Sequence, residues 1–188
     1  LVVPIHVCWS DVILDRNPCA GIDDPVRRKR WGVWCNQPRN DIVAARALAY
    51  PAQQVMVMVE SVEHGVHLWQ RLRPQGFEFV YGNTMTPDEF GSYQRAGLIP
   101  LDAKRLSPAR REELRKRFEA GDLRRVVTTV WDTGIDPVHL GVVVRAAATS
   151  SEQADQQEPG RSCRKVSGKE VGVVEDFLDQ FDSNFHRR

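Results

Sequence analysis

Two arginines three residues apart, Arg161 and Arg164, are the side chains of this sequence best suited to phosphate chemistry. On a helix, residues three apart lie on the same face, so both guanidinium groups would point the same way. A guanidinium group keeps its charge and presents a planar fork of N–H donors that fits phosphate oxygens. The alternative is a solvated basic helix face, since Lys165 and Lys169 follow. The spacing alone is compatible with both interpretations.

Ser61 offers a second place for a phosphate, because it follows an apolar run at residues 55–59 and precedes a helical pattern. A serine at the start of a helix directs its hydroxyl and the first free backbone N–H groups outward, where an anion can bind. His64 lies in the first turn of the same expected helix. The alternative is that Ser61 only caps the helix and that His64 only packs or faces solvent.

A third signal follows the apolar residues 126–130, where the chain reads Gly134-Ile135-Asp136. A glycine permits a tight turn and a close backbone approach, and an aspartate can accept hydrogen bonds from sugar hydroxyls. Trp131 is expected to pack in the interior, or to stack on a base if it is exposed. Such turns are common, so this signal alone is weak evidence for a nucleotide site. It becomes informative because the three phosphate and nucleotide signals follow one another in a fixed order along the chain.

Short valine-rich strands alternate with helical segments along the chain and would position these side chains. A continuous apolar run such as residues 55–59 is typical of a strand covered on both faces. We expect strands at residues 1–8, 55–59, 77–81, 126–130, 142–144 and 171–174, the first at a sheet edge because of Pro4. We expect helices capped by Asn40, Ser61 and Ser107 and one near residues 87–95, with a loop-like or partly helical stretch at 11–32. This alternation predicts an α/β fold with a mostly parallel sheet, helices on both faces, and ligands beyond the carboxyl ends of the strands.

The length and the net charge of the chain limit the classes of protein to which it can belong. The chain has 188 residues, which suits one domain, and its net charge of +1 provides no strong field for nucleic acid or anionic lipid. No apolar run approaches the roughly 20 residues of a membrane span, and no signal peptide opens the chain. The sequence starts at Leu1 within an apolar run, which suggests a fragment of a longer protein.

The four cysteines contain no Cys-x-x-Cys pair, and we expect reduced thiols in a cytoplasmic protein. Zinc held by His6, Cys8 and the other two N-terminal cysteines is an alternative, but the spacing fits no compact zinc module. The sequence therefore predicts no metal in this chain.

The order of the phosphate signals resembles the second RecA-like domain of superfamily 2 helicases, particularly those carried by bacteriophages. Residues 55–68 resemble motif IV, residues 126–137 resemble motif V, and residues 157–164 match the motif VI pattern Gln-x-x-Gly-Arg-x-x-Arg. Supporting similarities are the helix at 32–48, the Arg…Phe-x-x-Gly spacing of Arg110/Arg111, Phe118 and Gly121, and the closing strand and tail at 172–182. The resemblance covers nearly all of the chain from Gly32 onward and implies a RecA-like three-layer domain.

The resemblance also implies three groups of site residues. Arg161 and Arg164 would be catalytic arginine fingers, placed on the charge that develops as the γ-phosphoryl group leaves. ATP contacts would come from Gly134, Asp136, Gln157 and Gly160. Contacts to the phosphates of a nucleic-acid strand, which position it without reading its sequence, would come from Ser61, His64, Gly82, Asn83 and Thr128.

ATP and Mg²⁺ would be bound mainly by a separate N-terminal RecA-like domain, because this chain has no Walker A motif and no Asp-Glu box. The implied function is the C-terminal motor half of an ATP-dependent DNA helicase or translocase, inactive when alone. A non-catalytic nucleic-acid-binding or regulatory module with this fold is the alternative. The expected partners are the N-terminal domain and DNA. We expect a monomer in the cytoplasm, which for a bacteriophage protein is that of the host.

Some features depart from the family pattern. Pro159 and Glu158 lie inside motif VI, where they would alter the direction of Arg161. Residues 83–105 are longer than the usual connection and are expected to be an insertion that contacts DNA or a partner. We therefore expect an N-terminal strand and connecting segment at 1–31 and a helicase C-terminal domain at 32–188.

Overall fold

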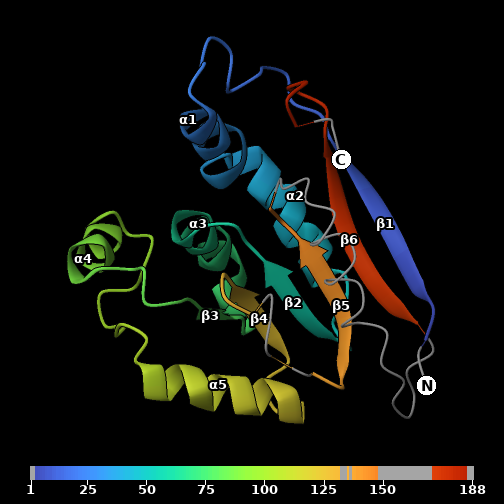
Figure 1. The fold of residues 1–188 in the computed structure, drawn as a ribbon, viewed down its shortest axis with the longest axis vertical. Helices are drawn as coiled ribbons and strands as arrows, with labels where there is room; N and C mark the ends of the chain where they lie inside the picture. The colour runs from blue at the N-terminus through green and yellow to red at the C-terminus, as the bar shows by residue number, and fades with distance from the viewer. Residues whose placement is uncertain (1–2, 132–134, 136, 148–170, 186–188) are drawn as a thin grey trace.

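The computed structural model describes residues 3–131, 135, 137–147 and 171–185. These residues form a six-stranded sheet in the order β1-β6-β5-β2-β4-β3, and every neighbouring pair of strands in it is parallel (Figure 1). The strands are β1 (Ile5–Val12), β2 (Gln54–Met58), β3 (Glu78–Val80), β4 (Arg125–Thr128), β5 (Leu140–Arg145) and β6 (Gly172–Asp179). The expected α/β fold with a parallel sheet is confirmed.

Helices cover both faces of this sheet. They are α1 (Pro25–Lys29), the π-helix η1 (Arg30–Trp34), α2 (Gln37–Leu48), α3 (Val62–Leu72), the 3₁₀-helix η2 (Arg73–Gln75), α4 (Pro87–Arg95) and α5 (Pro108–Ala120). Val55 and Val57 of β2 belong to the same apolar cluster as α2, α3 and α4, whereas Met56 and Met58 belong to the cluster that includes α5. Figure 1 shows strands between α3 and α5, as a three-layer domain requires.

The central strand is the one that the sequence predicts most directly. All five residues of β2 are buried, because β4 and β5 flank it and helices cover both of its faces. A strand in this position has no solvent-facing side, so its sequence reads as a continuous apolar run rather than an alternating one.

Helix starts follow side-chain caps. Ser61 accepts a hydrogen bond from the His64 backbone, and Ser107 accepts one from the Arg110 backbone, both at 3.1 Å. Both predicted caps are confirmed, and each satisfies a backbone N–H that has no partner inside the helix. The predicted helix at residues 87–95 is α4.

The helix start predicted at Asn40 is wrong. Helix α2 starts earlier, at Gln37, because Asn36 is the cap and Pro38 occupies the first turn. Asn40 is instead buried within the helix, where its amide donates to the Trp34 carbonyl at 2.9 Å.

Strand β6 extends five residues beyond its predicted end at position 174 and carries three fully buried carboxylates, Glu175, Asp176 and Asp179. An arginine pairs with each of them: Arg46 with Glu175 at 2.6 Å, Arg145 with Asp176 at 2.9 Å and Arg39 with Asp179 at 2.7 Å. A buried carboxylate is tolerated when an opposite charge and hydrogen bonds compensate its desolvation. These pairs fasten α2 and β5 to β6, and β6 in turn pairs with the edge strand β1.

The chain segment around α4 is ordered by hydrogen bonds and packing. A capping box closes the start of α4, in which Thr86 and Glu89 satisfy each other's backbone N–H groups. The amide of Gln94 donates to the carbonyls of Pro100, Leu101 and Ala103, and Phe90 packs into the larger apolar cluster. Among the described residues, no helix is long and apolar enough to cross a membrane.

Candidate functional site

Three neighbouring strands bring most of the described candidate residues to one edge of the sheet. β2, β4 and β3 are adjacent and parallel, so the segments that follow them meet at their carboxyl ends. The ladder continues into these segments, since Val59 donates to the Thr128 carbonyl and Thr129 donates to the Val80 carbonyl. Ser61, Gly82 and Thr128 therefore come from three different segments to a common edge.

A pocket of about 460 Å³ opens at this edge. It is lined by Glu60, Ser61, Val62, Glu63, Thr84, Glu89, Tyr93, Thr129 and Val130. Of the residues predicted to contact a strand, Ser61 lines the pocket itself. The start of α3 thus faces a cavity, where its backbone N–H groups and the positive end of the helix dipole favour an anion.

Three carboxylates in the pocket oppose that preference. Glu60 is paired with Lys29, and Glu63 accepts hydrogen bonds from Arg30 Nε at 3.0 Å and Nη2 at 2.7 Å. Glu89 accepts hydrogen bonds from Thr86, which lower the pKa of its carboxyl group. The ion pairs neutralise two of the three charges, so Lys29 and Arg30 reduce the repulsion that a phosphate would meet here.

Asn83 is held by a side chain from another element. Its Oδ1 accepts a hydrogen bond of 2.7 Å from Arg111 Nη2 on α5. This contact ties the loop after β3 to the helix that precedes β4, and it uses the carbonyl end of the amide. The NH₂ end of such an amide is the part that can donate to a phosphate oxygen.

Thr128 acts on the turn that follows β4. The residue is buried, and its hydroxyl accepts hydrogen bonds from the backbone N–H groups of Val130 at 3.2 Å and Trp131 at 3.3 Å. It therefore sets the shape of the segment after β4, whereas Thr129 lines the pocket. The sequence does not distinguish these adjacent threonines, because only the turn geometry separates their roles.

His64 lies in the interior. Its side chain has no exposed surface, and among the described residues neither ring nitrogen has a hydrogen-bond partner. Burial, with smaller contributions from the charges of Arg39 and His67, lowers the pKa of His64 well below 6.5. The structure gives this imidazole no route to a strand at the surface, so its predicted contact is not supported by its position.

The buried His64 predicts a pH dependence of stability. Below pH 6.5, His64 is protonated in the unfolded chain but stays neutral in the folded chain. The free energy of unfolding therefore falls as the pH decreases. The free energy of unfolding should therefore be lower at pH 5 than at pH 7.5, measured by urea unfolding. His64→Leu should flatten this dependence, and His139→Gln, at an exposed histidine, should keep it. An unchanged pH dependence in His64→Leu would contradict the assignment.

The remaining predicted site residues, Gly134, Asp136, Gln157, Gly160, Arg161 and Arg164, lie outside the described residues. The ATP contacts and the arginine fingers therefore stay predictions from the sequence.

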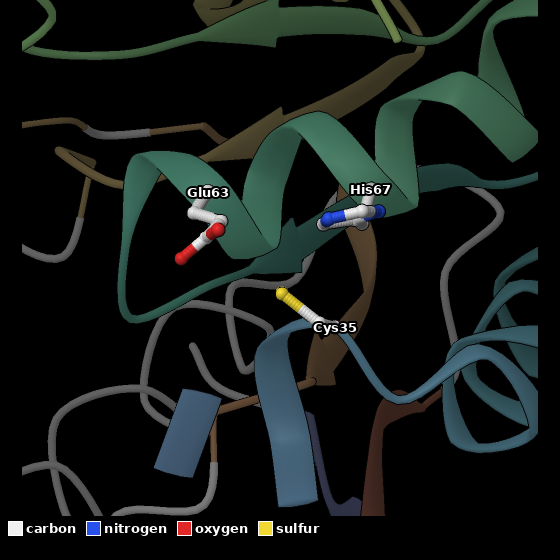
Figure 2. A group of neighbouring side chains, drawn as sticks. All are labelled: Cys35, Glu63 and His67. Carbon is white, nitrogen blue, oxygen red and sulfur yellow. The ribbon is translucent and has the colours of Figure 1, made fainter. Parts of the chain in front are cut away.

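A cluster that the sequence analysis did not predict lies beside the pocket. Cys35, Glu63 and His67 bring a sulfur, a carboxylate oxygen and an imidazole nitrogen within 4.8 Å of one another (Figure 2). Glu63 and His67 are four apart on α3, a spacing visible in the sequence once Ser61 is taken as the cap. The contribution of Cys35 has no such signal, because only the fold brings η1 against α3.

Comparison with known proteins identifies the fold. No family model matches the sequence, and no curated protein matches it. Solved structures do match. The C-terminal domain of the DEAD-box protein Dbp5 matches with a TM-score of 0.54 and 17% sequence identity, and the match covers 78% of this chain and 71% of the Dbp5 domain. S. cerevisiae Dbp5 bound to RNA and ADP BeF3 matches with a TM-score of 0.54 and 14% sequence identity. The match covers 98% of this chain and 36% of the Dbp5 chain. The C-terminal part of the Fun30 ATPase domain matches with a TM-score of 0.53 and 16% sequence identity. The match covers 81% of this chain and 45% of the Fun30 chain.

These likenesses show that the chain has a RecA-like α/β fold, as do the C-terminal domain of the DEAD-box protein Dbp5 and the C-terminal part of the Fun30 ATPase domain. The chain spans only about a third of the length of the full Dbp5 chain. Nothing in these matches links the chain to bacteriophages.

Proposed function

We propose that this chain is the C-terminal half of a two-domain motor that hydrolyses ATP while it holds a nucleic-acid strand. The carrying observation is the sheet order together with the pocket at its carboxyl edge, where the segments resembling motifs IV and V meet. The sequence that resembles motif VI supports the same proposal. The structural matches to Dbp5 with bound RNA and ADP BeF3 support it through the fold alone.

In this proposal Arg161 and Arg164 stabilise the γ-phosphoryl group during its transfer to water. The charge on that group's oxygens rises only as the transition state is approached, so a fixed guanidinium accelerates the step rather than simply binding substrate. Gly134 and Asp136 would contact the nucleotide ribose, while Gln157 and Gly160 would position the nucleotide against the fingers.

Among the described residues, the group of three potential metal ligands that lie close together includes a cysteine sulfur and a histidine nitrogen, which do not suit Mg²⁺. The carboxylates of β6 are buried against arginines. Mg²⁺ and the phosphate cradle therefore belong, in this proposal, to a domain with a Walker A motif, on the same polypeptide or on a partner chain.

The strand would lie across the start of α3 and the loops after β3 and β4. Ser61, Gly82 and Asn83 would contact its phosphates, and Thr128 would shape the β4 loop. We propose DNA as the strand, on the resemblance to bacteriophage helicases; the RNA bound in the Dbp5 structure makes RNA the comparison to test.

The strand contacts predict weak binding by the chain itself. Ser61, Gly82 and Asn83 are uncharged, so the affinity for a labelled single strand should fall only slightly between about 50 and 200 mM salt, measured by fluorescence anisotropy. Ser61→Ala should weaken binding about three- to tenfold, from the loss of one hydrogen bond to phosphate. Ser107→Ala removes an equivalent cap that lines a different cavity, so it should bind normally. Parallel measurements with DNA and RNA of one sequence identify the preferred strand, and unchanged binding by Ser61→Ala would contradict the proposed contact.

A non-catalytic binding or regulatory module is the second candidate. The observation that favours it is the set of carboxylates in the pocket, Glu60, Glu63 and Glu89, which a phosphate-binding surface does not need. The two candidates differ in ATP hydrolysis by the protein that carries both motor domains.

A further inference from the structure

We propose that Cys35, Glu63 and His67 form a binding site for one Zn²⁺ ion. Figure 2 shows Glu63 and His67 on successive turns of α3, with the sulfur of Cys35 directed between them from the end of η1. Thiolate, imidazole and carboxylate are the three ligand types that zinc takes in proteins. This inference does not depend on the proposed function.

The distances suit a site that tightens around the ion. The three ligand atoms lie within 4.8 Å of one another. Tetrahedral ligands at about 2.0–2.3 Å from zinc stand roughly 3.3–3.8 Å apart, so the side chains must approach by about 1 Å. All three side chains are only partly buried, which leaves room for side-chain adjustment and for a water molecule as the fourth ligand.

The two elements that carry the ligands are already fastened together. Lys29 pairs with Glu60, Arg30 pairs with Glu63, and the Trp34 indole donates to Glu60 at 3.4 Å. These contacts hold η1 and its flanking residues against the start of α3. An ion bound here would join two elements that already contact each other in the metal-free chain. Little ordering is therefore needed on binding.

The protonation of Cys35 and His67 sets the pH dependence expected of the site. Burial and the nearby Glu63 charge raise the pKa of the Cys35 thiol to about 11, so it does not form a reactive thiolate near neutral pH. Burial lowers the pKa of His67, which keeps the imidazole neutral, and its Nδ1 has no hydrogen-bond partner among the described residues. Zinc would displace the thiol proton, and binding would strengthen as pH rises.

The positive charges of Arg30 and Arg71 lie near the ligands and oppose the ion. The two hydrogen bonds that Arg30 donates to Glu63 both end on Oε1. The carboxylate therefore keeps a second oxygen to turn toward the metal, while Arg30 fixes its orientation in the way that outer partners orient metal ligands.

The test is a titration of the metal-free chain with Co²⁺, which reports thiolate ligation by a sulfur-to-cobalt charge-transfer band, followed by displacement with Zn²⁺. We expect one ion per chain and a band that Zn²⁺ abolishes. Cys35→Ser should remove the band, and Glu63→Gln and His67→Asn should each weaken Zn²⁺ binding at least about tenfold. Cys8→Ser, at another half-buried free cysteine, should leave both unchanged.

Thermal unfolding of each metal-free variant separates lost ligation from lost folding. If Cys35→Ser does not fold, the Zn²⁺ affinities of Glu63→Gln and His67→Asn decide the question. A titration without the charge-transfer band, or a band that survives in Cys35→Ser, would overturn the site. Zn²⁺ affinities unchanged in both Glu63→Gln and His67→Asn would do the same.

Discussion

Arg39→Ala should destabilise the fold by about 3–5 kcal/mol, because it removes a buried guanidinium charge and its hydrogen bonds from the buried carboxylate of Asp179. Arg39 is fully buried, and its guanidinium donates to Asp179 twice, through Nε at 2.7 Å and Nη2 at 3.1 Å. A third hydrogen bond of 2.8 Å goes to the Ala146 carbonyl at the end of β5. One side chain thus holds α2 against two strands, and a loss of this size is a large part of the total stability of a typical domain.

Urea unfolding measures this loss, with Arg95→Ala on α4 as the matched control. Arg95 is exposed, so its replacement should change the free energy of unfolding by no more than about 0.5 kcal/mol. A double-mutant cycle with Asp179→Asn should give a coupling energy of about 1–3 kcal/mol. Additive effects of the two substitutions would show that the pair does not act as a unit.

Arg164→Ala should reduce kcat for ATP hydrolysis by about 10³- to 10⁵-fold in the protein that carries both motor domains. The proposed role lies in the transition state, so kcat should fall far more than the affinity for ATP. Arg161→Ala should have a comparable effect if both arginines act as fingers. Steady-state ATPase rates with a saturating strand measure this.

Lys165→Ala is the control, since it removes a positive charge directly beside Arg164. It should leave kcat within a few-fold of the unmodified protein, because the resemblance assigns Lys165 no transition-state contact. An Arg164→Ala variant with unchanged kcat would favour the non-catalytic module.

The fold was predictable wherever burial and sequence pattern agree. The apolar run at residues 55–59 predicts the central strand β2 (Gln54–Met58) to within one residue at each end, and the run reflects the cover on both faces of that strand. Ser61 and Ser107 each mark a helix start, because a local cap needs only a few neighbouring residues.

Prediction failed where long-range partners decide the structure. The sequence suggests that β6 ends at position 174, since Glu175 and Asp176 look like surface residues; arginines from α2 and β5 make their burial possible. Asn36 and Asn40 are equally good caps by residue type, and the choice between them depends on Pro38 and on the contact of Asn40 with Trp34.

The candidate site divides in the same way. Ser61 could be placed at the pocket from local sequence, because the end of a buried strand and a helix start define that position. The sequence leaves open whether His64 contacts a strand, packs or faces solvent, since its interior location depends on the packing of α3 in the folded chain. Cys35 joins Glu63 and His67 only through the contact of η1 with α3, which no sequence spacing encodes.

The measurement that tests the central proposal most directly is strand-stimulated ATP hydrolysis by this chain, alone and together with the domain that carries the Walker A motif. The proposal predicts no turnover above background for the chain alone, and strand-stimulated turnover that requires Arg161 and Arg164 when both domains are present. Turnover by the isolated chain that Arg164→Ala abolishes would contradict it, as would a two-domain ATPase indifferent to both arginines.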